Sequence, residues 1–179
     1  DDDMQAEMYL AAVSKLTNSG YEQYEISNFA KPGFLCRHNY KYWDLSEYWG
    51  FGPSAHSFIG KMRFSYVKDT EAYINGVLKH GVIIESSETG NISERAGEYL
   101  MLMLRTTEGI SSKVLEKKFL TYFEEIEKCL LKYHKQGYVE FDGARWRLTP
   151  RGFLVSNTII SDLLIALENS RCVVNKLNL

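Results

Sequence analysis

The sequence lacks the clustered cysteines that would indicate a disulfide-rich or metal-bound scaffold. It contains three cysteines, Cys36, Cys129 and Cys172. Because their number is odd and their spacing wide, they form no disulfide framework, and a reducing compartment is the default. No apolar run approaches the roughly 18 residues that a membrane span needs, and the acidic start lacks the basic and apolar regions of a signal peptide. We therefore expect a cytoplasmic protein without a transmembrane segment.

The chain also lacks a strong excess of either charge. Its net charge of −2 argues against electrostatic attraction to nucleic acid or to an anionic membrane. Apolar residues make up 45% and aromatic residues 13% of the sequence, which is enough to build hydrophobic cores. A chain of 179 residues can form one large domain or two small ones.

The first half of the sequence predicts mixed α/β structure. A helix over residues 4–16, with a buried apolar stripe that includes Met4 and Met8, precedes a strand over residues 21–26. Helix followed by strand is one unit of an α/β barrel or an open parallel sheet. Further on we expect a strand over 48–51, a hairpin of 56–59 and 62–67, a helix over 71–79 capped by Asp69, and a break at residues 86–91.

Beyond that break the periodicity becomes helical. We expect helices over 93–105, 112–119 and 123–137, strands over 138–141 and 145–148, and a last helix from Pro150 to about Leu167, capped by Thr149. Three helices, a hairpin and a closing helix are typical of a winged-helix-like domain. The expected fold class is therefore α/β plus α+β, with one domain over residues 1–88 and another over residues 89–179.

Three short runs carry the clearest functional signal. They are Tyr24–Ala30 (YEISNFA), His38–Trp43 (HNYKYW) and Gly50–Ser57 (GFGPSAHS). Together they resemble the HemN-like branch of the radical S-adenosylmethionine (SAM) proteins. Within that branch they are most similar to the HemW type, which acts as a heme chaperone and is often labelled an oxygen-independent coproporphyrinogen III oxidase. The resemblance implies a partial radical SAM barrel, with residues 1–88 as its end and a β extension, followed by a winged-helix-like HemN C-terminal domain.

One feature of that family is missing. Radical SAM proteins hold a [4Fe–4S] cluster with three cysteines spaced Cys-x3-Cys-x2-Cys, and this sequence has no such pattern. We therefore expect the chain to be the C-terminal part of a longer protein, whose upstream half holds the cluster and SAM. An edge strand near residues 21–26, left without its barrel neighbours, would favour self-association.

His38 is the first candidate ligand. The resemblance assigns heme binding to His38, Asn39, Tyr42 and Trp43, with the imidazole as an axial ligand of the heme iron. In a helix, His38 and Tyr42 would share a face at i, i+4 spacing. The alternative is structural, because His and Asn often cap backbone groups while Tyr and Trp fill a core. A zinc site at Cys36 and His38 lacks a second ligand pair, so Cys36 is better interpreted as a free buried thiol.

Glu25, Ser27 and Asn28 form a second candidate group. They follow a predicted barrel strand, and barrel enzymes bind ligands at the carboxyl ends of their strands. The resemblance places this segment in the SAM and substrate pocket, where Glu25 would accept hydrogen bonds from a ribose or an amino group. The alternative is that Ser27 and Asn28 satisfy the backbone of a turn. No catalytic residue is assigned to this part of the protein.

The resemblance implies a heme-binding chaperone that delivers heme to partner enzymes. The runner-up is coproporphyrinogen III oxidation, but the oxidase type carries Gly-Met-Asp-His-Phe-Ala where this chain has Glu25–Ala30. A third class is a winged-helix regulatory or interaction module. Binding of nucleic acid by that module is disfavoured, since residues 93–179 carry 13 Lys and Arg against 11 Asp and Glu. The candidate recognition helix also opens with Glu124, Glu125 and Glu127.

Overall fold

The protein consists of two compact units. A computed structural model describes residues 2–79, 81 and 83–177. The first unit comprises Asp1–Asp44 and Ile92–Leu179, and the second comprises Leu45–Asn91. The end of the second unit lies close to the domain boundary predicted at residues 88 and 89. That boundary itself stays a prediction, because residues 1–44 belong to the same compact unit as the C-terminal half of the chain.

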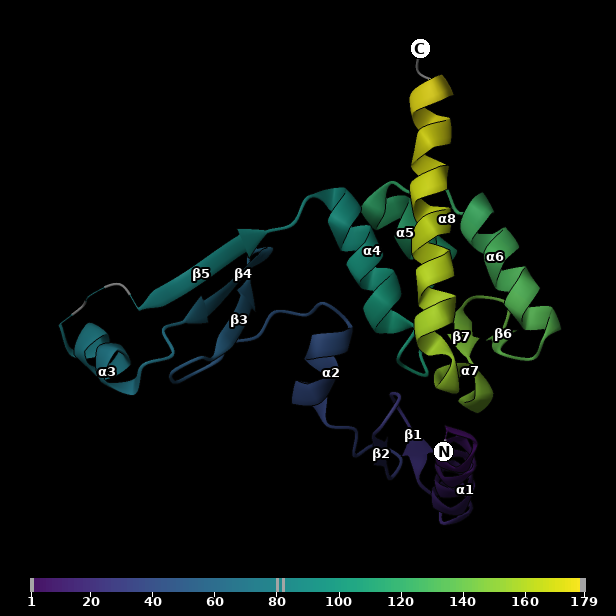
Figure 1. Cartoon of the computed structure of the whole chain (residues 1–179), viewed down its shortest axis with the longest axis horizontal. Helices are drawn as coiled ribbons and strands as arrows, with labels where there is room; N and C mark the ends of the chain where they lie inside the picture. The colour runs from purple at the N-terminus through teal and green to yellow at the C-terminus, as the bar shows by residue number, and fades with distance from the viewer. Residues whose placement is uncertain (1, 80, 82, 178–179) are drawn as a thin grey trace. The chain divides into compact units, whose positions relative to one another are not determined.

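Four helices form the core of the first unit (Figure 1). They are α4 (Ile92–Met103), α5 (Ser112–Phe119), α6 (Glu124–Lys135) and α8 (Ser156–Leu177). Their apolar residues recur at helical spacing and turn inward, so that Leu100, Ile126, Leu130, Ile159 and Leu163 are all 0% exposed. The predicted helices over 93–105, 112–119 and 123–137 are confirmed.

A hairpin and a short helix complete this core. The predicted strands are β6 (Val139–Phe141) and β7 (Trp146–Leu148), joined by a turn in which Gly143 has a φ of +93°. The predicted cap is also confirmed, because Thr149 Oγ1 accepts a hydrogen bond of 3.1 Å from the Gly152 backbone N–H. The single closing helix expected from the sequence is wrong. The chain leaves helical geometry at Val155, and α7 (Pro150–Leu154) is thus separate from α8.

The beginning of the chain packs beside this core with little burial of its own. It contains α1 (Asp2–Asn18), β1 (Glu22–Gln23), β2 (Phe29–Ala30) and α2 (Arg37–Trp43). The predicted first helix is confirmed, but its buried stripe is wrong, since Met4 and Met8 are 58% and 66% exposed. The strand expected over residues 21–26 shortens to β1, because the chain turns back and the Tyr24 N–H donates to the Asn28 carbonyl at 3.1 Å.

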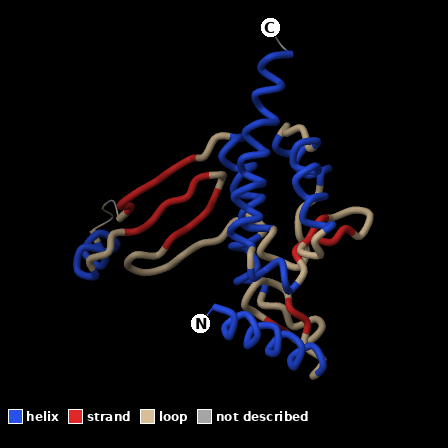
Figure 2. The backbone as a smooth tube through the Cα atoms, turned by 45° about the vertical axis from the view of Figure 1, so that its right-hand side comes forward, coloured by secondary structure: helices blue, strands red, loops and turns tan. Residues whose placement is uncertain are grey.

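The second unit is a three-stranded antiparallel sheet with one helix (Figure 2). The strands are β3 (His56–Ile59), β4 (Met62–Tyr66) and β5 (Ile84–Thr89), and the helix is α3 (Thr70–Leu78). The predicted hairpin is confirmed, as is the cap, in which Asp69 accepts from the Ala72 N–H at 2.7 Å. Two expectations need correction. The break expected at residues 86–91 narrows to residues 90 and 91, because β5 continues to Thr89. The strand expected over 48–51 is reduced to a bridge between Tyr48 and Phe58.

The described residues thus form a mixed α/β structure, and the strand pairs within their sheets are antiparallel. Among those residues, no helix is both long enough and apolar enough to cross a membrane.

Candidate functional site

The two groups of residues predicted from the sequence lie close together in the chain, on the β1–β2 hairpin and on α2. Both elements contact the loop that follows α4, residues 104–111. This loop therefore connects the candidate site to the helical core of the same unit.

Backbone hydrogen bonds fix the hairpin against that loop. The Ile26 N–H donates to the Arg105 carbonyl at 2.8 Å, and the Thr107 N–H donates to the Tyr24 carbonyl at 3.2 Å. Residues 24–26 therefore pair with residues 105–107 like a short antiparallel strand, centred on a bridge between Glu25 and Thr106. Pairing of this kind holds the hairpin in one register.

The pairing buries the side chain of Glu25, which is 1% exposed. Its Oε1 atom is buried without a hydrogen-bond donor. A buried acceptor without a partner costs free energy on the order of 1–3 kcal/mol, so such an atom calls for an explanation. Ser27 and Asn28 lie at the exposed tip of the hairpin. The structure therefore separates Glu25, which faces inward, from Ser27 and Asn28, which face solvent.

Helix α1 also supports the hairpin. Gln23 Nε2 donates to Tyr9 Oη at 2.8 Å, and Tyr9 Oη donates to the Ile26 carbonyl at 3.3 Å. Burial, and more weakly the charge of Glu25, raise the pKa of the Tyr9 hydroxyl. A neutral Tyr9 that donates this bond is therefore part of the structure at ordinary pH.

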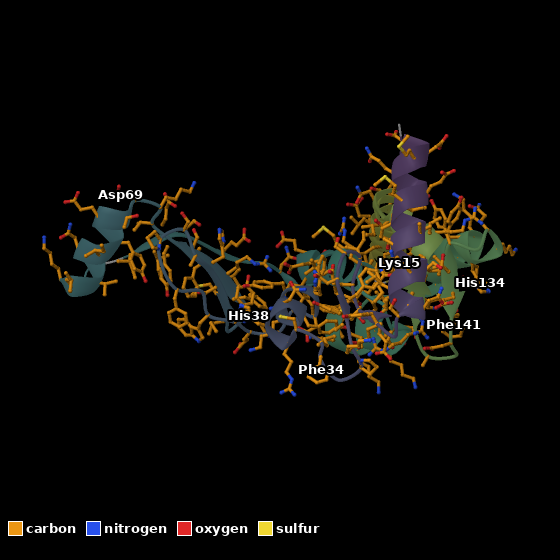
Figure 3. All side chains as sticks on the ribbon, turned by 90° about the horizontal axis from the view of Figure 1, so that it is seen from below. Lys15, Phe34, His38, Asp69, His134 and Phe141 are labelled. Atoms are coloured by element: carbon orange, nitrogen blue, oxygen red, sulfur yellow. The ribbon has the colours of Figure 1, made fainter. Side chains whose placement is uncertain are left out.

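Helix α2 presents the predicted heme-binding residues on an exposed face. His38 and Tyr42 are one turn apart, with 3.1 Å between His38 Nε2 and Tyr42 Oη and 5.4 Å between perpendicular rings. His38 is exposed (Figure 3) and Tyr42 is 42% exposed. The i, i+4 placement is confirmed, and both side chains can be reached by a ligand from solvent.

The other two residues of this motif face the protein. Asn39 Nδ2 donates to Tyr24 Oη at 3.4 Å, which links α2 to the hairpin. Trp43 is half-buried, and its Nε1–H is buried without an acceptor. The structure therefore brings His38 and Tyr42 together on the exposed face of α2, while Asn39 and Trp43 are turned towards the rest of the protein.

Cys36, directly before α2, is exposed, so the prediction of a buried thiol is wrong. Across the part of the chain that the structure describes, no three His, Cys, Asp or Glu side chains are grouped to hold a metal ion.

Three residues that are not among the predicted ligands support α2. Tyr40 Oη donates to Glu108 Oε2 at 2.6 Å, and Arg145 Nη2 lies 2.8 Å from Glu108 Oε1. Burial and the bond to Glu108 raise the pKa of Tyr40 well above its ordinary value of 10.0. These residues come from three distant parts of the sequence, so no local spacing or periodicity could have connected them.

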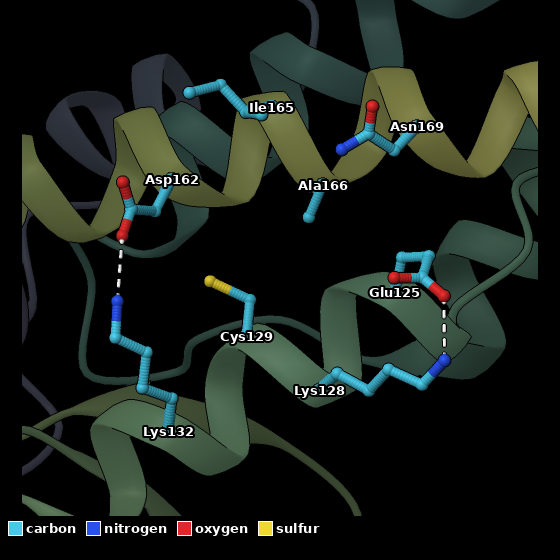
Figure 4. A pocket seen from close by; sticks show the side chains of 8 residues that line it. All are labelled: Glu125, Lys128, Cys129, Lys132, Asp162, Ile165, Ala166 and Asn169. Atoms are coloured by element: carbon cyan, nitrogen blue, oxygen red, sulfur yellow. Dashed lines mark hydrogen bonds and ion pairs between the residues drawn. The ribbon is translucent and has the colours of Figure 1, made fainter.

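A shallow groove lies between α6 and α8, away from these residues (Figure 4). Its volume is about 340 Å³, and Cys129 on α6 and Ala166 on α8 both line it. Ion pairs cross or border the groove, with 3.5 Å between Lys132 Nζ and Asp162 Oδ2. Burial raises the pKa of the Cys129 thiol, which disfavours the reactive thiolate. The neutral thiol is therefore the favoured form of Cys129.

The helical core matches a known domain family. Residues 93–155 match the HemN C-terminal domain. Most of the chain is also similar to curated proteins named heme chaperone HemW. The protein from Bacillus subtilis is 32% identical over 163 residues, covering 90% of this chain and 43% of the relative. The protein from Escherichia coli is 29% identical over 167 residues, covering 89% and 42%.

A further relative of the same name, from Synechocystis, is 32% identical over 183 residues, with 91% of this chain and 44% of the relative covered. The chain thus spans less than half the length of these relatives. Among solved structures, coproporphyrinogen III oxidase (HemN) from Escherichia coli, a radical SAM enzyme, has a TM-score of 0.64 at 19% identity. The match covers 86% of this chain and 39% of that protein, and it shows a similar fold.

Proposed function

We propose that this chain is part of a heme-binding chaperone, on the premise that residues 93–155 match the HemN C-terminal domain and that most of the chain is similar to proteins named heme chaperone HemW. Such a protein binds heme and passes it to partner enzymes. The observation that carries the proposal is the exposed pair of His38 and Tyr42 on α2, in a chain that is similar to HemW over most of its length.

The residues of α2 suit a heme ligand. The His38 imidazole is exposed, and imidazole nitrogen is a common axial ligand of heme iron. Its hydrogen bond with Tyr42 restrains the orientation of the ring. A partner at one nitrogen also influences which tautomer the imidazole adopts. The exposed Tyr42 ring supplies apolar area against which a flat macrocycle packs favourably. Bound heme would be the cargo of the protein, and His38 would determine how it is held.

We also propose that Glu25, Ser27 and Asn28 belong to a SAM and substrate pocket. The orphaned Oε1 supports this for Glu25, since a ligand hydroxyl or amino group would supply the donor that it lacks. Ser27 and Asn28, which face solvent, rest on the resemblance alone. SAM and a [4Fe–4S] cluster would be held mainly by residues outside this chain, which has no Cys-x3-Cys-x2-Cys pattern.

The finer architecture follows the same proposal. Residues 1–88 would form the end of a radical SAM barrel with a β extension, and residues 89–179 a winged-helix-like domain. The exposure of Met4 and Met8 on α1 supports this assignment, because neighbouring barrel elements would cover them. The chain by itself would then tend to self-associate through this uncovered surface.

The test is a hemin titration of the full-length protein that carries this chain, followed at the Soret band. We expect saturable binding by the unaltered protein, and a shifted or lost Soret band in His38→Ala. His134→Ala serves as the matched control, since His134 is also exposed but lies on α6, with its Nδ1 bonded to the Val139 carbonyl at 2.8 Å. The heme proposal fails if folded His38→Ala and His134→Ala both bind hemin like the parent protein.

A second function, oxygen-independent coproporphyrinogen III oxidation, is favoured by one observation, the fold that this chain shares with HemN. The run Glu25–Ala30 argues against it, because it departs from the Gly-Met-Asp-His-Phe-Ala of the oxidase type. Incubation of the cluster-loaded full-length protein with SAM, reductant and coproporphyrinogen III separates the two. We expect no decarboxylated product, whereas its formation would favour the oxidase.

A further inference from the structure

Helix α2 cannot hold its own position. It has seven residues, no side-chain cap at its start and no buried residue. Isolated helices shorter than about 12 residues are marginal in water, because nucleation costs more than so few hydrogen bonds return. The pose of His38 therefore depends on what the rest of α2 contacts.

Tyr40 provides a polar attachment of α2 to the C-terminal half of the chain. It lies two positions after His38, about 200° around the helix, so that the two side chains project from opposite faces. His38 faces solvent, while Tyr40 is half-buried and donates to Glu108 Oε2 at 2.6 Å. A hydrogen bond to a carboxylate is shorter and stronger than one between neutral groups. Tyr40 therefore anchors the helix from which His38 projects.

Glu108 is in turn held by the β6–β7 hairpin. Arg145 Nη2 lies 2.8 Å from Glu108 Oε1, and Arg145 Nη1 donates to the Gly109 carbonyl at 3.3 Å. The backbone beside Glu108 is fixed as well, because Ile110 and Trp146 exchange two hydrogen bonds, of 2.8 and 2.9 Å. Gly109 has a φ of +68°, and a Cβ there would overlap the carbonyl oxygen of Trp146. The carboxylate is thus presented to Tyr40 from a rigid support.

We infer that Glu108 is a positioning residue for His38, acting through Tyr40, and that the HemN C-terminal domain thereby sets the pose of the proposed heme-binding helix. This inference rests on the proposed function, and it gives the C-terminal domain a part in cargo binding without contact to the cargo. Its consequence is that heme affinity depends on residues of α2 and of the β6–β7 hairpin together.

The test uses Tyr40→Phe in the full-length protein, because this change removes one hydroxyl and keeps the ring. We expect hemin to bind about fivefold more weakly, with an unchanged Soret position because His38 is still present. The α2 amides should exchange with deuterium faster than in the parent protein. Glu108→Gln, which keeps an acceptor but loses the charge, should give a smaller change in the same direction.

Tyr133→Phe is the matched control. Tyr133 Oη donates to Asp162 Oδ2 at 2.6 Å, which is the same kind of bond at the same distance, but between α6 and α8. We expect this variant to leave hemin affinity and α2 exchange unchanged. In a His38→Ala background, Tyr40→Phe should have no further effect on hemin, since a positioning residue acts only through the group that it positions.

The outcomes separate this inference from the proposed function. If the parent protein binds no hemin, the proposed function fails. Deuterium exchange of the α2 amides then tests by itself whether Tyr40 and Glu108 anchor the helix. Unchanged α2 exchange in Tyr40→Phe overturns the inference. It is also overturned if Tyr40→Phe and Tyr133→Phe weaken hemin binding equally, because the effect would then be one of general stability.

Discussion

The segment that carries the candidate site and the domain that supports it differ sharply in burial. Helices α1 and α2 contribute no buried side chain, whereas α4 alone contributes Ala96, Tyr99, Leu100 and Met103. Burial of apolar surface contributes roughly 25 cal/mol per Å², so the stability of the first unit comes mostly from residues 92–170. The exposed candidate ligands, by contrast, lie at residues 27–42. Substitutions in the two regions should therefore separate stability from ligand binding.

The largest expected effect is in the core. Leu100 is 0% exposed, so Leu100→Ala leaves a cavity and should lower the free energy of unfolding by about 3 kcal/mol. Met8→Ala on α1 is the counterpart, because Met8 is 66% exposed and its removal should cost less than about 0.5 kcal/mol. Urea unfolding of both variants, followed by circular dichroism, measures the difference. Equal losses would contradict the contrast in burial between the two regions.

The next effect concerns the loop that connects them. Gly109→Ala combines a positive φ with an overlap against Trp146, and should lower the free energy of unfolding by roughly 2 kcal/mol or more. Gly143→Ala has a φ of +93° but nothing within 4 Å, so only backbone strain remains, about 1 kcal/mol. The same unfolding experiment compares the two. If Gly143→Ala lowers the free energy of unfolding as much as Gly109→Ala does, then close packing against Trp146 is not the reason that position 109 requires glycine.

A smaller effect appears at high pH. Burial first, and then the hydrogen bond to Asp162, raise the pKa of Tyr133 from 10.0 to about 12. Because the folded state holds this proton more tightly, the contribution is fully present below pH 10 and is lost as pH rises towards 12. We expect the free energy of unfolding of Tyr133→Phe to fall less steeply over that interval than that of the parent. Identical slopes would contradict the raised pKa.

The sequence predicted the C-terminal half well because its signals are local. Apolar residues at helical spacing and the Thr149-Pro150 cap each determine structure within a few residues, and both appear in the fold. The start of the chain was predicted less well. Apolar residues recur at helical spacing along α1, but no other described residue covers Met4 and Met8, so both remain exposed.

The candidate site shows the same division. The helical placement of His38 and Tyr42 followed from i, i+4 spacing. The anchoring by Tyr40, Glu108 and Arg145 could not be predicted, because it depends on tertiary contacts between positions far apart in the sequence. Likewise, the burial of Glu25 results from pairing with residues 105–107, and no pattern around Glu25 indicates that pairing.

The most direct test of the account measures two quantities on one variant, His38→Ala in the full-length protein. His38 is exposed, so we expect a free energy of unfolding within about 0.5 kcal/mol of the parent value. The same protein should lose or shift the Soret band in a hemin titration. A Soret band identical to that of the parent, in a protein shown to be folded, would contradict the central claim that His38 on α2 holds the heme.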